Sequence, residues 1–321
     1  TIHQRRLQRH RQGCVGGSHR LEILGDQLAR AHPGLGAIRR RQEVRVGQHR
    51  IDERVGAVAR RGPFSVWYPV DAADREGIEV YAIGGFVRDL LLDRPPLEID
   101  FVTVGADSGI TLARTLGDEF GRCSVDVYPK FGTAAVRFWE HDRYPVELLE
   151  FVAARKESYR SESRKPDVHE GTIADDQLRR DFTINAMAIA LSSEDFGTLI
   201  DPFDGLGDLE RRMLRTPRPA EETFEDDPLR MIRAVRFAAE LGFGIEAAAL
   251  RAMHATAERV TILSQERITD ALLKMMRSDN PSVGFKLLHA TGILDHFFPE
   301  LCALQGVETV GGQAHKDNFF H

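Results

Sequence analysis

The chain has 321 residues, of which 42% are hydrophobic and 29% charged, and its formal net charge is −6. This length and composition predict a globular protein of two or more domains. No apolar run approaches the roughly 20 residues of a membrane span, and no signal peptide opens the chain. Three separate cysteines (Cys14, Cys123 and Cys302) form neither a disulfide framework nor a zinc motif, so a cytoplasmic location is expected.

Residues 1–62 differ in composition from the rest of the chain. They contain 14 Arg, no Lys and 5 acidic residues, a local charge of +9, so the remainder carries −15. A basic arm of this kind suggests contact with nucleic acid. The stretch has little apolar periodicity and lacks an initiator Met. We therefore interpret it as a disordered extension or as sequence outside the native reading frame.

From about Pro63 the pattern is that of a packed α+β head with a small mixed sheet, predicted over residues 63–215. Runs rich in Val, Ile, Phe and Tyr predict strands, and apolar residues three or four apart predict helices. In chain order the expected elements are a strand over 77–83 that enters a Gly-Gly turn, a helix over 86–92, a strand over 97–104, a helix over 108–121 closed by Gly121, and strands within 124–139 and 144–155.

The second half of the chain changes from mixed to helical patterns. Residues 155–180 are charged and weakly periodic and predict a mobile loop over the site, whereas 184–191 predicts a buried run. Beyond Glu221, apolar residues three or four apart predict consecutive helices. We divide this part into a helical neck over 216–275 and the start of a helical body over 276–321.

The most informative stretch lies between Tyr81 and Thr103. Glu98 and Asp100 are two apart in a predicted strand, so their carboxylates project to the same face. This arrangement is costly unless a positive charge lies between them, and oxygen ligands suit Mg²⁺. Upstream, Gly84 and Gly85 allow the backbone to approach a ligand where a helix begins, which is typical of a phosphate site.

A third carboxylate is expected on a neighbouring strand to complete a metal site. Glu147 and Glu150 are both available in the strand predicted within 144–155, and they face opposite sides because they are three apart. Downstream, Arg179–Ala186 reads RRDFTINA, in which Arg is a bidentate phosphate donor while Asp and Asn can hydrogen-bond ribose hydroxyls.

These segments resemble a known family. The stretch from Tyr81 to Thr103 is similar to the signature of polymerase-β-like nucleotidyltransferases, specifically the bacterial tRNA nucleotidyltransferase (CCA-adding) and poly(A) polymerase family. RRDFTINA resembles a second family motif, and Asp226–Arg230 resembles its Glu-Asp-x-x-Arg motif with Asp in place of Glu. The resemblance covers roughly Val66 to His321. The family reads Asp-x-Asp where this chain has Glu98-Ile99-Asp100, an arm one methylene longer.

The resemblance implies transfer of CMP and AMP from CTP and ATP to the 3′ hydroxyl of tRNA, with pyrophosphate released. The family places its strand carboxylate five residues before an Arg, which favours Glu150 and includes Arg155. The implied catalytic and Mg²⁺-binding residues are Glu98, Asp100 and Glu150. The implied nucleotide-binding residues are Gly84, Gly85, Arg88, Arg155, Arg180, Asp181, Asn185, Asp227, Arg230 and Arg233.

The resemblance also implies how the base is chosen. Asp227 and Arg230, three apart and so on one helical face, would form a protein template for the base. Arg233 and Arg236 continue the basic face toward RNA or triphosphate. The acidic start of this helix is also what the helix dipole alone would favour.

Two other functions stay open. A poly(A) polymerase or a partial A-adding or CC-adding enzyme would share these motifs, and Glu98, Asp226 and the early C-terminus are compatible with an inactive RNA-binding remnant.

The last residues, His315, Asp317 and His321, resemble the start of an HD-type phosphohydrolase domain. A metal site of that type needs later ligands, so no metal is assigned there.

Overall fold

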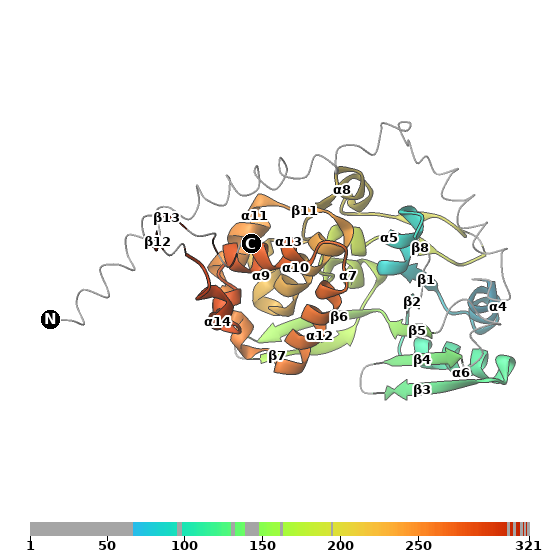
Figure 1. Cartoon of the computed structure of the whole chain (residues 1–321). Helices are drawn as coiled ribbons and strands as arrows, with labels where there is room; N and C mark the ends of the chain where they lie inside the picture. Colours follow the sequence, from blue (N-terminus) through green and yellow to red (C-terminus); the bar gives the residue numbers. More distant parts are fainter. Residues whose placement is uncertain are drawn as a thin grey trace. The chain divides into compact units, whose positions relative to one another are not determined.

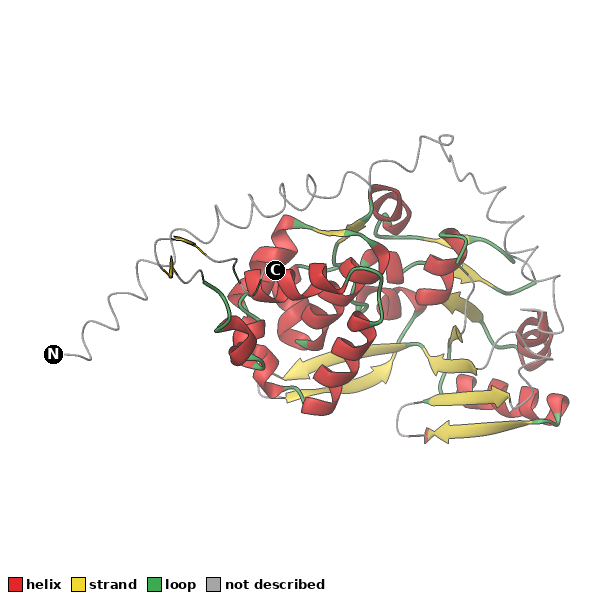
Figure 2. Ribbon diagram, viewed as in Figure 1, coloured by secondary structure: helices red, strands yellow, loops and turns green. Residues whose placement is uncertain are grey.

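The computed structural model describes residues 67–94, 98–129, 132–138, 148–160, 163–193, 195–306, 309–310, 313–314, 317 and 319. The described chain forms two compact units (Figures 1 and 2). The first comprises the described residues up to 211 together with 215–218, and the second comprises 212–214 and those from 219 on. The predicted extension over 1–62 lies outside the described residues. None of the described helices is long and apolar enough to cross a membrane.

A mixed seven-stranded sheet forms the centre of the first unit. The strands lie in the order β3 (Cys123–Tyr128), β4 (Thr133–Phe138), β5 (Leu148–Ala153), β2 (Glu98–Thr103), β1 (Val80–Ile83), β8 (Ala188–Ala190) and β9 (Leu199–Ile200). Only the β2–β5 pair is parallel among these neighbours. β1 and β8 are buried along their whole length, which explains their unbroken apolar sequences.

Helices cover this sheet and connect its strands. α4 (Trp67–Glu76) packs on α6 (Ser108–Phe120), which in turn packs on β3, β4 and β5 (Figure 1). Gly109 permits a close approach, because a Cβ there would lie 3.2 Å from the Phe151 carbonyl. Gly121 ends α6 with a left-handed φ of 66°, as predicted. The short helix α5 (Gly85–Leu91) follows β1 directly.

The prediction of a mobile loop over 155–180 was wrong. This segment forms an antiparallel hairpin of β6 (Arg155–Arg160) and β7 (Ser163–Glu170), followed by α7 (Ile173–Leu178). Arg155 pairs with Glu170 across the hairpin, and opposite charges in that position are favourable. Backbone hydrogen bonds carry the pairing, so the segment needs no alternating apolar face to be a strand. Thr172 and Asp175 cap α7 in a reciprocal capping box.

The second unit is mainly helical, as predicted. Its helices are α9 (Ala220–Asp226), α10 (Leu229–Leu241), α11 (Ala247–Ala255), α12 (Gln265–Met276), α13 (Pro281–Ala290) and α14 (Pro299–Cys302). α10 packs against α12 and α13 and buries Met231, Ile232 and Val235. Gly242 ends α10 with a φ of 67°, as predicted. The two-residue strands β10 (Met213–Leu214), β11 (Gly244–Ile245), β12 (Thr309–Val310) and β13 (Gln313–Ala314) were not predicted. An α+β head and a helical second part are therefore confirmed.

Candidate functional site

Strand pairing brings two of the predicted carboxylates together. β2 and β5 are parallel, and Asp100 lies opposite Glu150 in their register. Directly paired residues on neighbouring strands present their side chains to the same face of the sheet. Glu98, at the exposed start of β2, shares that face because it lies two residues before Asp100. The second expected candidate on this strand, Glu147, lies outside the described residues.

The carboxylates interact electrostatically. Partial burial, followed by the charges of Asp100 and Glu98, raises the pKa of Glu150 above its ordinary value. Among the residues that the structure describes, no group of three or more His, Cys, Asp or Glu side chains is gathered closely enough to hold a metal by itself. A divalent cation would relieve the mutual repulsion, and carboxylate oxygens are the donors that hard cations bind. Carboxylate oxygens on one face of the sheet are therefore the type of donor that suits such an ion.

The glycine turn after β1 lies against the same strand. Gly84 has φ 80° and ψ −136°, a conformation that residues with a Cβ rarely adopt. A Cβ at this position would lie 2.9 Å from Arg180 Nη1 and 3.5 Å from Asp100 Oδ2. The missing side chain thus makes room for a guanidinium and a carboxylate at one point. The Gly84 N–H donates to the Met187 carbonyl (3.3 Å), so this amide is already used within the protein at the turn where the sequence predicted a phosphate site.

Three predicted nucleotide-binding residues are joined in one buried chain of hydrogen bonds. Arg88 Nη1 donates to Asn185 Oδ1 (2.8 Å), and Asn185 Nδ2 donates to Asp181 Oδ1 (3.0 Å). Arg88 is also bound on its other edge by Asp89, through Nε (3.0 Å) and Nη2 (2.9 Å). Asp181 Oδ1 accepts a further bond from the Phe182 amide (2.8 Å). The guanidinium of Arg88 and the carboxylate of Asp181 are therefore held on either side of one amide.

Asp176, which the sequence analysis did not select, positions the arginine pair. It is fully buried in α7 and accepts from Arg180 Nε (3.0 Å) and Nη2 (2.9 Å) and from Arg179 Nε (2.9 Å), with a further contact to Arg179 Nη2. Burial opposes its charge, but the Arg180 and Arg179 guanidiniums outweigh that effect and lower the pKa of Asp176. The i, i+3 and i, i+4 spacing to the two arginines was the available sequence signal.

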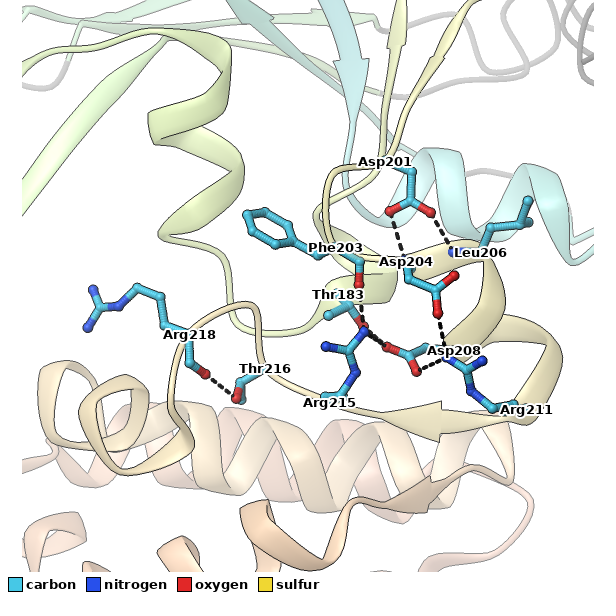
Figure 3. A network of polar contacts seen from close by, with 11 residues as sticks. Thr183, Asp201, Phe203, Asp204, Leu206, Asp208, Arg211, Arg215, Thr216 and Arg218 are labelled. Carbon is cyan, nitrogen blue, oxygen red and sulfur yellow. Dashed lines mark hydrogen bonds and ion pairs between the residues drawn. The ribbon is translucent and has the colours of Figure 1, made fainter.

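A second network supports the segment η3 (Thr183–Asn185) and α8 (Gly205–Arg211) (Figure 3). Asp208 is 1% exposed, accepts from Thr183 Oγ1 (2.7 Å) and forms ion pairs with Arg211 and Arg215 (both 2.8 Å). The Thr183 amide donates to the Arg215 carbonyl (2.8 Å). Gly205 lies so close that a Cβ would be 2.4 Å from the Thr183 carbonyl. Asp208 was also missed, because an isolated acidic residue in a helix carries no distinguishing pattern.

Arg155, the remaining predicted arginine of the first unit, opens β6 immediately after Ala154. The Ala154 amide donates to the Thr103 carbonyl (2.7 Å) at the end of β2. Gly171 packs against the backbone of Arg155, where a Cβ would lie 2.7 Å from its carbonyl carbon. Arg155 therefore marks the point where the central sheet passes into the hairpin.

In the second unit, the prediction that Asp227 and Arg230 share one helical face was wrong. α9 ends at Asp226, and Asp227 is extended (φ −139°, ψ 101°). Its Oδ1 accepts from the Leu229 amide (3.2 Å) at the start of α10, and its carbonyl accepts from the Arg230 amide (3.0 Å). Pro228 follows Asp227, and a residue before proline is disfavoured in the helical region. Asp227 therefore stabilises the beginning of the helix that carries Arg230.

Further along α10, arginines cluster around an aromatic ring. The Arg233 and Arg236 guanidiniums lie over Phe237, 5.2 Å and 4.5 Å from its ring centroid.

Near the C-terminus, Asp317 accepts from the amides of Gly306 and Phe319 (both 2.9 Å). The histidines at 315 and 321 of the HD-like segment lie outside the described residues.

Two family models match the chain. The Poly A polymerase head domain matches residues 80–215, and the model described as the probable RNA and SrmB-binding site of polymerase A matches residues 242–304. The first match includes the sheet, the glycine turn and the Arg180 cluster. The second match covers α11, α12 and α13.

Named relatives agree with these matches. An A-adding tRNA nucleotidyltransferase of Aquifex aeolicus (strain VF5) is 42% identical over 166 residues, 52% of this chain and 19% of that protein. A multifunctional CCA protein of Pseudomonas aeruginosa (strain LESB58) is 37% identical over 235 residues, 72% of this chain and 53% of that protein. The chain thus spans about half the length of the Pseudomonas protein and less of the Aquifex one.

Solved structures are also similar. A tRNA nucleotidyltransferase crystallised with a primer tRNA and an incoming ATP analogue is 31% identical, with a TM-score of 0.59. That comparison covers 74% of this chain and 67% of the solved one. The resemblance therefore extends from the sequence motifs to the backbone.

Proposed function

The chain belongs to the tRNA nucleotidyltransferase and poly(A) polymerase family, and from this premise we propose that it transfers CMP and AMP from CTP and ATP to the 3′ end of tRNA. In this reaction the terminal 3′ oxygen attacks the α-phosphorus of the nucleotide. The bond from the α-phosphorus to the bridging oxygen breaks, and pyrophosphate leaves. The additions proceed without a nucleic-acid template, in a cytoplasmic enzyme.

One observation carries this proposal: Gly84 faces both Arg180 and Asp100, because a Cβ added there would lie 2.9 Å from Arg180 Nη1 and 3.5 Å from Asp100 Oδ2, while Asp100 is paired with Glu150. A nucleoside triphosphate needs cationic donors for its phosphates and carboxylates for the metal that accompanies them. Both requirements meet at one turn whose shape depends on glycine. This proximity supports nucleotide chemistry more directly than either feature alone.

Members of this family generally use divalent metals, and we assign Mg²⁺ to the carboxylates Glu98, Asp100 and Glu150. Bound there, Mg²⁺ would lower the charge on the α-phosphate and favour the deprotonated 3′ oxygen. Glu98 lies at the exposed start of β2, where a longer side chain has room to adjust.

The remaining assignments follow the charge of each group. Arg88, Arg155 and Arg180 supply positive charge for the triphosphate, and Asp181 supplies a hydrogen-bond acceptor for a sugar hydroxyl. In the helical unit, Asp227, Arg230 and Arg233 select the base through donors and acceptors on one short segment. The proposed nucleotide-binding residues are therefore Gly84, Gly85, Arg88, Arg155, Arg180, Asp181 and Asn185 in the first unit, and Asp227, Arg230 and Arg233 in the second.

An A-adding enzyme is the second candidate, because the Aquifex relative bears that name. The test uses three tRNA transcripts that end before the CCA, after the first C and after the second C. Each is incubated with the chain, Mg²⁺ and either CTP, ATP or both, and the new 3′ ends are sequenced. CCA on the first transcript supports the proposal. A single A added only to the third transcript supports the A-adding function, and a run of A supports poly(A) synthesis.

Asp100→Asn serves as the matched inactive control in that assay. Incorporation by the wild-type chain no higher than that of Asp100→Asn would contradict a transferase. Retained tRNA binding with that result would identify an RNA-binding remnant.

A further inference from the structure

We propose that Asn185 is a positioning residue that holds the two nucleotide-facing groups Arg88 and Asp181 in one fixed arrangement. This inference rests on the proposed function and deepens it. Asn185 is 4% exposed, and both polar atoms of its side-chain amide are bound within the protein. The main role of Asn185 is therefore to fix the positions of Arg88 and Asp181 rather than to contact a ligand itself.

The chemistry of the neighbours determines the orientation of the amide. Arginine has only donors and a carboxylate has only acceptors. The amide oxygen of Asn185 must therefore face Arg88, and the amide nitrogen must face Asp181. No other uncharged side chain of this size offers an acceptor and a donor on two adjacent branches, and reversing the amide would break both bonds.

The backbone around Asn185 holds the bridge in place. η3 (Thr183–Asn185) is bound through Thr183 to Asp208 and to the Arg215 carbonyl. The backbone N–H of Asn185 donates to the Phe182 carbonyl (2.9 Å), which closes the turn that begins after Asp181. The side chain thus projects from a segment that is anchored on its far side.

The two groups that Asn185 joins belong to distant parts of the sequence. Arg88 lies on α5, next to the Gly84 turn, and Asp181 follows α7 and the arginine pair. Without the bridge, Arg88 keeps its bonds to Asp89, and Asp181 keeps its bond from the Phe182 amide. Both groups would remain in place on their own segments, but their positions relative to each other would no longer be fixed by one side chain. We therefore expect the loss of Asn185 to weaken binding of the whole nucleotide rather than the chemical step.

The first test measures CTP and ATP binding by isothermal titration calorimetry with MgCl₂, using the full chain. Because each bond of the bridge involves a charged partner, Asn185→Ala should raise the Kd for CTP about tenfold or more. In the transfer assay, KM should rise by a similar factor while kcat changes little. A fall in kcat at unchanged KM would overturn the positioning role.

A double-mutant cycle gives a readout that a structural role would not change. If Asn185 acts through Asp181, the double variant Asn185→Ala/Asp181→Ala should bind CTP about as weakly as Asp181→Ala alone. Additive losses would overturn the coupling. Ser108→Ala is the matched control, because this buried hydroxyl of the same unit bonds to Thr103 Oγ1 (2.7 Å) and not to the bridge. It should leave the Kd for CTP unchanged.

Asn185→Asp keeps the test decisive if the alanine variant fails to fold. It preserves the size of the side chain and the acceptor for Arg88, but it replaces the donor to Asp181 with an oxygen and places a second negative charge beside that carboxylate. CTP affinity should again fall about tenfold. Wild-type affinity in Asn185→Asp would overturn the inference and leave the proposed function intact. A wild-type chain that binds neither CTP nor ATP would overturn the proposed function, and this inference with it.

Discussion

Replacement of Asp176 by asparagine should destabilise the first unit strongly. The Asp176 carboxylate is 0% exposed, while the Arg179 and Arg180 side chains are 17% and 18% exposed. The substitution keeps the shape of the side chain but removes its charge. The two largely buried guanidiniums would then lose the carboxylate that binds both of them, and the nitrogen of the asparagine amide would direct donors at donors.

The size of the effect follows from these contacts. Breaking a buried ion pair by removing one partner typically costs about 3–5 kcal/mol, because the remaining charge is left uncompensated. Some water reaches both arginines, so we expect the lower part of that range, about 3 kcal/mol. Arg180 would also lose its fixed orientation beside Gly84, and CTP binding should weaken in the same variant.

Tryptophan fluorescence in urea measures this effect in the relevant unit, because Trp67 lies at the start of α4 in the first unit. The other tryptophan, Trp139, lies outside the described residues. The control is Asp118→Asn, an exposed aspartate on α6 that should change the unfolding free energy by less than about 0.5 kcal/mol. A loss below about 1 kcal/mol in Asp176→Asn would refute the reasoning, since it would mean that the arginines need no buried counter-ion.

Three other results are expected. Asp100→Asn should abolish nucleotide transfer while leaving the urea midpoint unchanged, and full activity with Mg²⁺ would exclude Asp100 as a ligand. Gly84→Ala should weaken CTP binding more than Gly77→Ala, since both glycines have positive φ (80° and 66°) but only the first is crowded, and equal affinities in a titration would contradict this. The pKa of Asp176 is lower in the folded protein, so its contribution to stability is present above the ordinary aspartate pKa of about 3.9 and is lost as pH falls through the folded pKa. Between pH 7 and pH 3, the free energy of unfolding in urea should therefore fall more steeply for the wild type than for Asp176→Asn. Parallel curves for the two proteins would disprove this expectation.

Local sequence patterns predicted most elements of the fold. The alternation around Glu98 and Asp100 identified β2, and Gly121 and Gly242 marked the ends of α6 and α10. The hairpin of β6 and β7 was missed because its residues lack an apolar periodicity, although their backbones pair. Charge alone therefore does not distinguish a loop from a two-stranded ribbon.

The predicted start of the helix at Asp226 was wrong. The acidic run at Asp226 and Asp227 resembled the first turn of a helix, but Asp226 ends α9 and Asp227 links it to α10. Spacing along the sequence could not reveal this break, because the same three-residue separation occurs within a helix and across a cap. The change matters for the proposed base recognition, since Asp227 presents an extended backbone rather than a helical face.

The glycine pair, the carboxylates of β2 and the RRDFTINA segment were all recognisable from residue type and local spacing. Which of these groups meet depends on how distant segments pack. The parallel register of β2 and β5 pairs Asp100 with Glu150, and a buried hydrogen bond joins Asn185 to Arg88, which lies 97 residues earlier in the chain. Strand register and burial arise from packing between distant segments, so no local pattern in the chain encodes them.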